Sequence, residues 1–177
     1  MSTLNVTNIK GEGGGTTAMT LDSAGRILTP ARPYFRVGMG TSQTGITNGD
    51  VIFDTIKDNV GGHYSTSNGR FTAPIAGVYQ FGHSVLFQDV ANSDDGITLH
   101  YYKNGSGDNE SWLFDRAQGE DANGYSGSGG YLNSRGSGTI TLAVGDYVNL
   151  NVYTSGSIGV HGNSNQSWSQ WYGYLIG

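Results

Sequence analysis

Apolar and polar residues alternate along much of this chain with a period of two, which is typical of β-strands. The clearest stretch is 78–87, in which every second residue from Tyr79 to Phe87 is aromatic, Val or His. Turn residues interrupt the alternation, and Gly145-Asp146 is expected to form a two-residue hairpin link. Short strands at fairly regular spacing, without a helical period, predict an all-β sandwich or barrel. The expected strands lie near residues 34–37, 51–56, 78–87, 97–102, 139–144, 148–152 and 170–176.

The N-terminal part of the chain differs from the rest. A few apolar residues among polar neighbours precede a glycine-rich stretch at 11–15, and strands this short cannot bury a core alone. Pro30 and Pro33 then mark a boundary, because proline breaks regular structure and stiffens a linker. We therefore predict an extended arm at 1–31 and a globular head at 32–177. The arm is either unstructured or ordered only against sister chains or a docking partner.

The composition narrows the class of protein. Of the 177 residues, 30 are Gly and 11 are Tyr, a mixture that disfavours helices and suits strands and turns. The net charge is −5 and only nine Lys and Arg are present, scattered along the chain, so no nucleic-acid partner is expected. Without cysteine there is no disulfide or thiolate metal site. No apolar run is long enough for a membrane span or a Sec-type signal peptide, so neither is expected.

Candidate catalytic groups lack the arrangements that catalysis needs. No G-x-S-x-G nucleophile elbow occurs, and the histidines do not have zincin spacing. A glycosidase needs two placed carboxylates, whereas the candidates lie in one Gly- and Ser-rich stretch that is unsuited to holding a pair. These candidates are Asp108, Glu110, Glu120 and Asp121. We expect a non-enzymatic protein, with a glycan hydrolase as a third alternative.

One acidic loop is a candidate calcium site. Asp89, Asp94 and Asp95 could supply the oxygen ligands that calcium prefers, and the alternative interpretation is a solvated turn. No other cofactor and no catalytic residue is expected.

Four sequence blocks occur in a fixed order. They read GRFTAPIAGVYQF at 69–81, YKNG at 102–105, LAVGDYV at 142–148 and WYGYLI at 171–176. Together they closely resemble the C1q-like globular domain, whose pattern is G-x-F-x-x-P-x-x-G-x-Y-x-F, a K-N-G turn, L-x-x-G-D-x-V and a terminal aromatic-x-G-aromatic-L-I strand. The resemblance implies a ten-stranded C1q/TNF-like jelly roll that assembles as a homotrimer and serves as a recognition head.

The N-terminal segment indicates the kind of assembly in which the protein works. Animal members of the family carry a collagen-like Gly-X-Y stalk, and this chain has none. Residues 1–9 and 20–27 (TLDSAGRI) instead resemble the start of phage tail-fibre-like proteins. The combined resemblance implies a bacteriophage virion protein: a tail fibre, head fibre or capsid decoration protein. Its arm would contact other virion proteins and its head would adhere to a host-surface glycan or protein. The alternative is a non-viral C1q-like ligand-binding module of a bacterial or secreted protein.

Two groups of residues are candidate sites. The long polar stretch 104–138 carries Trp112, Tyr125 and Tyr131, and Tyr with Ser, Gly and Asn makes adaptable contact surfaces. We expect these three aromatic residues to face a receptor. A second group is expected to pack in the core or at the trimer contact, and it comprises Tyr79, Phe81, His83, Trp171 and Tyr174.

Overall fold

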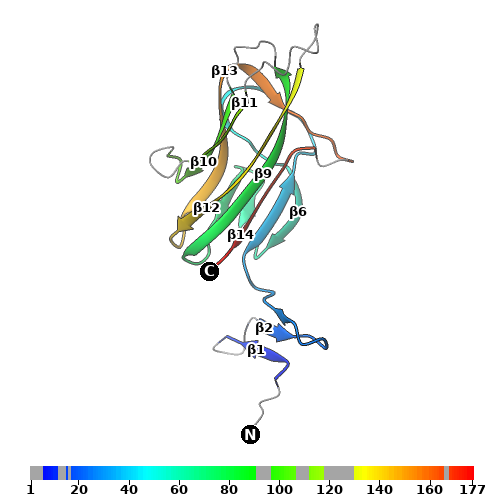
Figure 1. Ribbon diagram of the computed structural model, residues 1–177, viewed down its shortest axis with the longest axis vertical. Helices are drawn as coiled ribbons and strands as arrows, with labels where there is room; N and C mark the ends of the chain where they lie inside the picture. The colour runs from blue at the N-terminus through cyan, green and yellow to red at the C-terminus, as the bar shows by residue number, and fades with distance from the viewer. Residues whose placement is uncertain are drawn as a thin grey trace.

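The computed structural model describes residues 6–11, 15, 17–90, 97–106, 112–117, 130–165 and 168–177, and every regular element among them is a β-strand. Three short strands form a small antiparallel sheet in the arm: β1 (Asn8–Lys10), β2 (Thr17–Leu21) and β3 (Ile27–Leu28). The other eleven described strands, β4–β14, form the head. Figure 1 shows the arm sheet below the head, joined to it by one extended segment.

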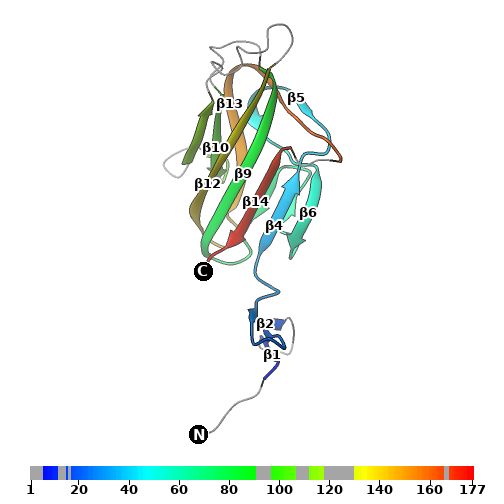
Figure 2. The ribbon, with the colours of Figure 1, turned by 45° about the vertical axis from the view of Figure 1, so that its right-hand side comes forward.

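The head has two layers (Figure 2). The first layer contains, in spatial order, β12 (Gly130–Leu142), β9 (Gly77–Val90), β14 (Gln170–Leu175), β4 (Tyr34–Gly38) and β6 (Thr55–Val60), all antiparallel. We call this layer the first sheet. The strand order, with sequence-distant β14 between β9 and β4, is that of a jelly roll rather than of a simple meander.

The second layer, the second sheet, is built around β13 (Tyr147–Val160). On one side β13 pairs with β10 (Ile97–Lys103), which pairs in turn with β11 (Trp112–Ala117). On the other side it pairs with β8 (Arg70–Thr72) and β5 (Gln43–Asp50), while β7 (Tyr64–Ser65) pairs with β8. The far end of β13 also pairs with β9, at Gly159 with Gln88 and Val160 with Phe87. This contact joins the two layers at one corner.

The core between the layers is rich in aromatic rings. Trp171 on β14 is fully buried, 4.8 Å from the ring of Phe35 and 6.0 Å from that of Phe81. Tyr101 reaches Trp171 from the second sheet with a ring separation of 6.2 Å. Complete burial of a large apolar side chain contributes about 1.5–3 kcal/mol, so this cluster is a main source of head stability.

Two local predictions from the sequence were wrong. Residues 51–54 do not form a strand, although Val51 and Phe53 are fully buried; the strand begins at Thr55. Gly145-Asp146 is not a hairpin link, because β12 pairs with β9 whereas β13 pairs with β10 and β8. The chain crosses between the layers here, so that Leu142 and Val148 can both point into the core.

Asp146 stabilises this crossing. Its two carboxylate oxygens accept hydrogen bonds from Asn104 Nδ2 at 2.8 Å and from the Ala143 amide at 2.9 Å. The Lys103 ammonium lies 3.4 Å from the same carboxylate. The hydrogen bond from Asn104, with those from Ala143 and Lys103, holds the pKa of Asp146 below its usual range. The carboxylate therefore ties the 102–105 turn to the 142–148 crossing.

We predict that Asp146→Asn lowers the free energy of unfolding by about 1 kcal/mol at pH 7. Because the pKa is lower in the folded chain, the contribution is present above the unfolded-state value of about 4 and is lost as the pH falls through the folded-state value. Urea midpoints of wild type and variant should therefore differ at pH 7 and converge towards pH 2. The matched control is Asp58→Asn, which removes an exposed ion pair with Arg36. Equal differences at both pH values would contradict the assignment.

Gly173 gives a second prediction. A Cβ at this position would lie 2.6 Å from Phe81 Cδ1 and 2.7 Å from Phe35 Cε1, both in the packed core. We expect Gly173→Ala to reduce the free energy of unfolding by roughly 1–3 kcal/mol through overpacking. Gly177→Ala is the control, since no atom lies within 4 Å of its Cβ position. Thermal denaturation followed by near-UV circular dichroism measures both, and equal midpoints would refute the packing argument.

Candidate functional site

The outward face of the first sheet presents tyrosines. Tyr174 on β14 lies opposite Tyr34 on β4, and Tyr172 lies opposite Arg36. The Tyr172 ring lies directly over Gly82 of β9 and occupies the space that a side chain there would fill. Burial, with the nearby Asp58 carboxylate, raises the pKa of Tyr34. We call the surface formed by Tyr34, Val78, Tyr172, Tyr174 and Ile176 the tyrosine face.

The lower end of the tyrosine face is apolar and exposed. The exposed fractions are 38% for Val78, 39% for Tyr174 and 45% for Ile176. Two charged side chains on this face, Arg36 and Asp58, form an ion pair at 2.9 Å. An exposed surface that is aromatic and carries little net charge is typical of protein contacts.

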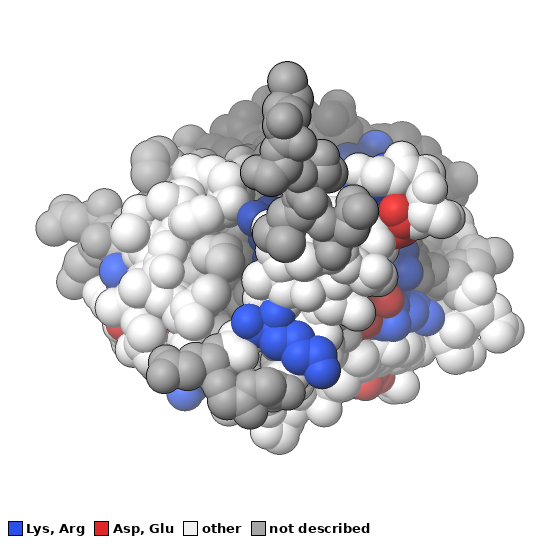
Figure 3. All heavy atoms as spheres, turned by 90° about the horizontal axis from the view of Figure 1, so that it is seen from below, with Lys and Arg blue, Asp and Glu red and all other residues white. Residues whose placement is uncertain are grey.

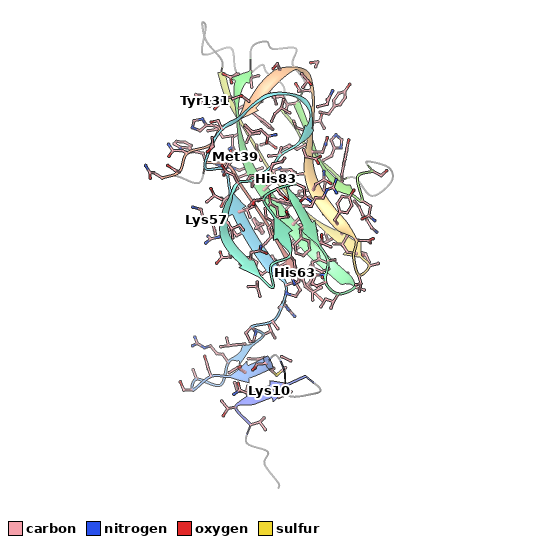
Figure 4. All side chains as sticks on the ribbon, turned by 180° about the vertical axis from the view of Figure 1, so that it is seen from behind. Lys10, Met39, Lys57, His63, His83 and Tyr131 are labelled. Atoms are coloured by element: carbon pink, nitrogen blue, oxygen red, sulfur yellow. The ribbon has the colours of Figure 1, made fainter. Side chains whose placement is uncertain are left out.

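A groove lies at the other end of the same layer. It has a volume of about 390 Å³ and is lined by Leu86 of β9, Tyr131 of β12, and His161 and Trp168 of the segment between β13 and β14. Tyr131 and Trp168 are 59% and 47% exposed. Figure 4 shows Tyr131 at the end of the head that is remote from Lys10 of the arm. We call this the aromatic groove.

His161 holds the aromatic groove in shape. Its Nδ1 lies 2.8 Å from Gln88 Oε1, and an amide oxygen only accepts, so Nδ1 carries the proton. With Nδ1 engaged by Gln88, Nε2 is the ring nitrogen left to contact a ligand. The His161 amide donates to the Leu86 carbonyl at 2.7 Å, and the His161 carbonyl accepts from Ser169 Oγ at 2.8 Å. Both the backbone and the ring of His161 are thus fixed.

The histidine ring also organises the two exposed aromatic rings. Its centroid lies 5.3 Å from that of Tyr131 and 6.1 Å from that of Trp168, edge to face in both cases. Such perpendicular contacts are favoured by the aromatic quadrupole. They orient Tyr131 and Trp168 without covering them.

A second histidine, His83, is buried between the layers. Its Nδ1 lies 2.8 Å from the Tyr101 hydroxyl, and its Nε2 lies 3.4 Å from Ser134 Oγ. All three side chains are at most 5% exposed, and burial raises the pKa of Tyr101 well above its ordinary value. This polar cluster links both layers, and its burial removes it from contact with a ligand.

The candidate residues from the sequence are spread over several parts of the molecule. Tyr79, Phe81, His83 and Trp171 lie in the core of the single chain, whereas Tyr174 lies on the tyrosine face. Tyr131 lines the aromatic groove, and Trp112 begins β11. Asp89, expected in an acidic loop, lies in strand β9. The remaining candidates lie outside the described residues: Tyr125, Asp94, Asp95, Asp108, Glu110, Glu120 and Asp121.

Sequence reasoning did not identify the aromatic groove. Leu86, Tyr131 and the segment 161–168 are far apart in the chain, and the pairing of β9 with β12 and β13 brings them together. The available signal was a pair of bulky aromatic residues in polar surroundings, Tyr131 and Trp168, because an unburied aromatic in such a stretch is typical of a contact surface.

Other kinds of site were sought in the described part of the chain. No group of three or more His, Cys, Asp or Glu side chains there could hold a metal ion. None of the described residues belongs to a helix that could cross a membrane. On the face seen in Figure 3, Lys and Arg form small groups among uncharged residues and acidic side chains rather than one broad basic patch.

Two antiparallel layers with this jelly-roll strand order match the C1q/TNF-like class of β-sandwich. Within this class the chain belongs to the C1q domain family, whose model matches residues 34–176. The globular domain of zebrafish complement 1qA protein is similar, with a TM-score of 0.58, 17% identity, and coverage of 82% of this chain and 98% of that chain. Murine APRIL has a TM-score of 0.54 and 11% identity, with coverage of 82% and 99% respectively.

These comparisons confirm the predicted all-β, C1q/TNF-like jelly roll. At such low identities the structural likeness bears on the fold alone. No curated protein matches the sequence. The phage-like character of the N-terminal segment stays a prediction.

Proposed function

We propose that this chain is a homotrimeric, non-enzymatic binding protein of a bacteriophage virion. In this role it is a tail fibre, a head fibre or a capsid decoration protein. The C1q-like head adheres to the host surface, and the arm contacts other virion proteins. The single observation that supports the proposed trimeric assembly is the exposed tyrosine face of a head that belongs to the C1q domain family.

The tyrosine face supports self-assembly. Members of the C1q and TNF-like class form homotrimers, and the partner that covers this face is then a sister chain. Burying Tyr174, Val78 and Ile176 removes a contiguous apolar surface from water, and hydrophobic burial is the main driving force for such association. Three heads on one particle also gain avidity, because each binding event raises the effective concentration for the next.

The arm supports attachment to a larger particle. Its small sheet leaves Val6, Ile9, Ile27 and Leu28 at 38%, 49%, 62% and 47% exposure. A sheet of this size cannot bury its own apolar side chains, so a partner surface is needed to stabilise it. The arm and the aromatic groove lie at opposite ends of the molecule (Figures 1 and 4). A docked arm therefore leaves the groove facing outward.

The mass of the purified chain in solution tests the assembly. We expect light scattering to give a trimer for the full-length chain and for a form without residues 1–31, because the tyrosine face lies in the head. Tyr174→Asp combined with Val78→Asp should lower the mass to that of a monomer. Tyr153→Asp is the matched control, since Tyr153 is 60% exposed on β13 of the second sheet. A monomeric wild type would refute the trimeric assembly.

The virion setting needs a separate test. Peptides of this chain should co-sediment with purified phage particles through a density gradient, and antibodies against the head should label the particle surface. If the chain is absent from particles and instead found free in the medium or on cells, the alternative of a non-viral ligand-binding module replaces the virion assignment.

A further inference from the structure

The aromatic groove has the size and shape of a small-molecule site. Its volume of about 390 Å³ falls within the range of roughly 300–1,000 Å³ that is typical of such sites. It is too small for a helix or a sheet of a protein partner. Its exposed rings, Tyr131 and Trp168, come from two separate elements and flank a fixed histidine.

The chemistry of the lining favours an uncharged, hydroxyl-rich ligand. Among the described residues that line the groove, none is a carboxylate, an ammonium or a guanidinium. Nδ1 of His161 is held by Gln88, which leaves Nε2 as the ring nitrogen that can hydrogen-bond to a ligand hydroxyl. The electron-rich faces of Tyr131 and Trp168 suit the C–H groups of a sugar ring, which carry a weak positive charge.

The surroundings of the groove supply further neutral polar groups. Asn133, which lies opposite Leu86 across β12 and β9, is exposed and contacts Ser84 Oγ at 3.5 Å. The nearby Arg135 donates to Asn133 Oδ1 at 2.7 Å, so this guanidinium is directed to the amide. Amide and hydroxyl groups beside aromatic rings form a surface that matches alternating C–H and O–H groups.

From this arrangement we propose that the aromatic groove binds one or two residues of an uncharged saccharide. Tyr131 and Trp168 stack on the sugar, and His161 Nε2 hydrogen-bonds to a hydroxyl. The proposal rests on the proposed function of the head as a binding module and names the ligand class of that module. All the residues proposed to contact the saccharide belong to one chain.

The experiment uses the labelled full-length chain on an array of oligosaccharides. Neutral glycans ending in glucose, galactose, rhamnose or N-acetylglucosamine are compared with sialylated and phosphorylated glycans of the same length. We expect binding to a subset of the neutral glycans. The best of them, as a free monovalent oligosaccharide, is then titrated by calorimetry so that avidity does not contribute.

Variants in the groove give the sharper readout. Trp168→Ala and Tyr131→Ala should each weaken binding of the free oligosaccharide tenfold or more, while Trp168→Phe, which keeps an aromatic face, should retain part of the affinity. Tyr153→Ala is the control, because it removes an equally exposed tyrosine from the second sheet. Light scattering on every variant should give the wild-type mass.

Three outcomes would overturn the proposal. The first is a trimeric wild type that binds no neutral glycan. The second is a set of groove variants that bind like wild type. The third is a change of mass in the groove variants, because the groove would then be a contact between sister chains. The first two leave the trimeric assembly intact. A monomeric wild type that still binds neutral glycan through Trp168 would instead overturn the proposed assembly and support the groove.

Discussion

The close approach of the aromatic rings around Trp171 is the constraint on which the head depends. Trp171 is in contact with rings from both layers, and Gly173 two residues later leaves Phe35 and Phe81 the space that a side chain would take. Trp171 and Gly173 are both on β14, which lies between β9 and β4 in the first sheet. Without this central strand the outer faces would lose their common support.

Because side chains alternate along β9, neighbouring residues of this strand lie on opposite faces of the first sheet. Tyr79, Phe81 and His83 point into the core, so Val78, Leu86 and the even-numbered residues between them lie on the outer face. The same strand therefore supports the core, the tyrosine face and one side of the aromatic groove. A shift of one residue in register would turn the buried side chains of β9 outward and its exposed side chains into the core.

The fold was predictable from the sequence because its signals are local. Alternation around Tyr79 and Phe81 predicted a strand with one buried face, and the four ordered blocks identified the jelly roll. The crossing at Gly145-Asp146 was mistaken for a hairpin, since a short turn sequence does not reveal which strands pair. Trp168 and His161 were visible as residues, but not as neighbours of Tyr131. Their proximity is a property of long-range pairing, which no local pattern encodes.

The place where the arm joins the head determines how the molecule bears a load. The chain enters the head directly at β4, which is paired on both sides, with β14 and with β6. Tension applied between the arm and the remote end of the head would pull β4 along its own axis. The backbone hydrogen bonds to both neighbours then resist in shear, all together, rather than opening one after another. The joint is therefore mechanically strong along the direction of pull, even though each hydrogen bond contributes little by itself.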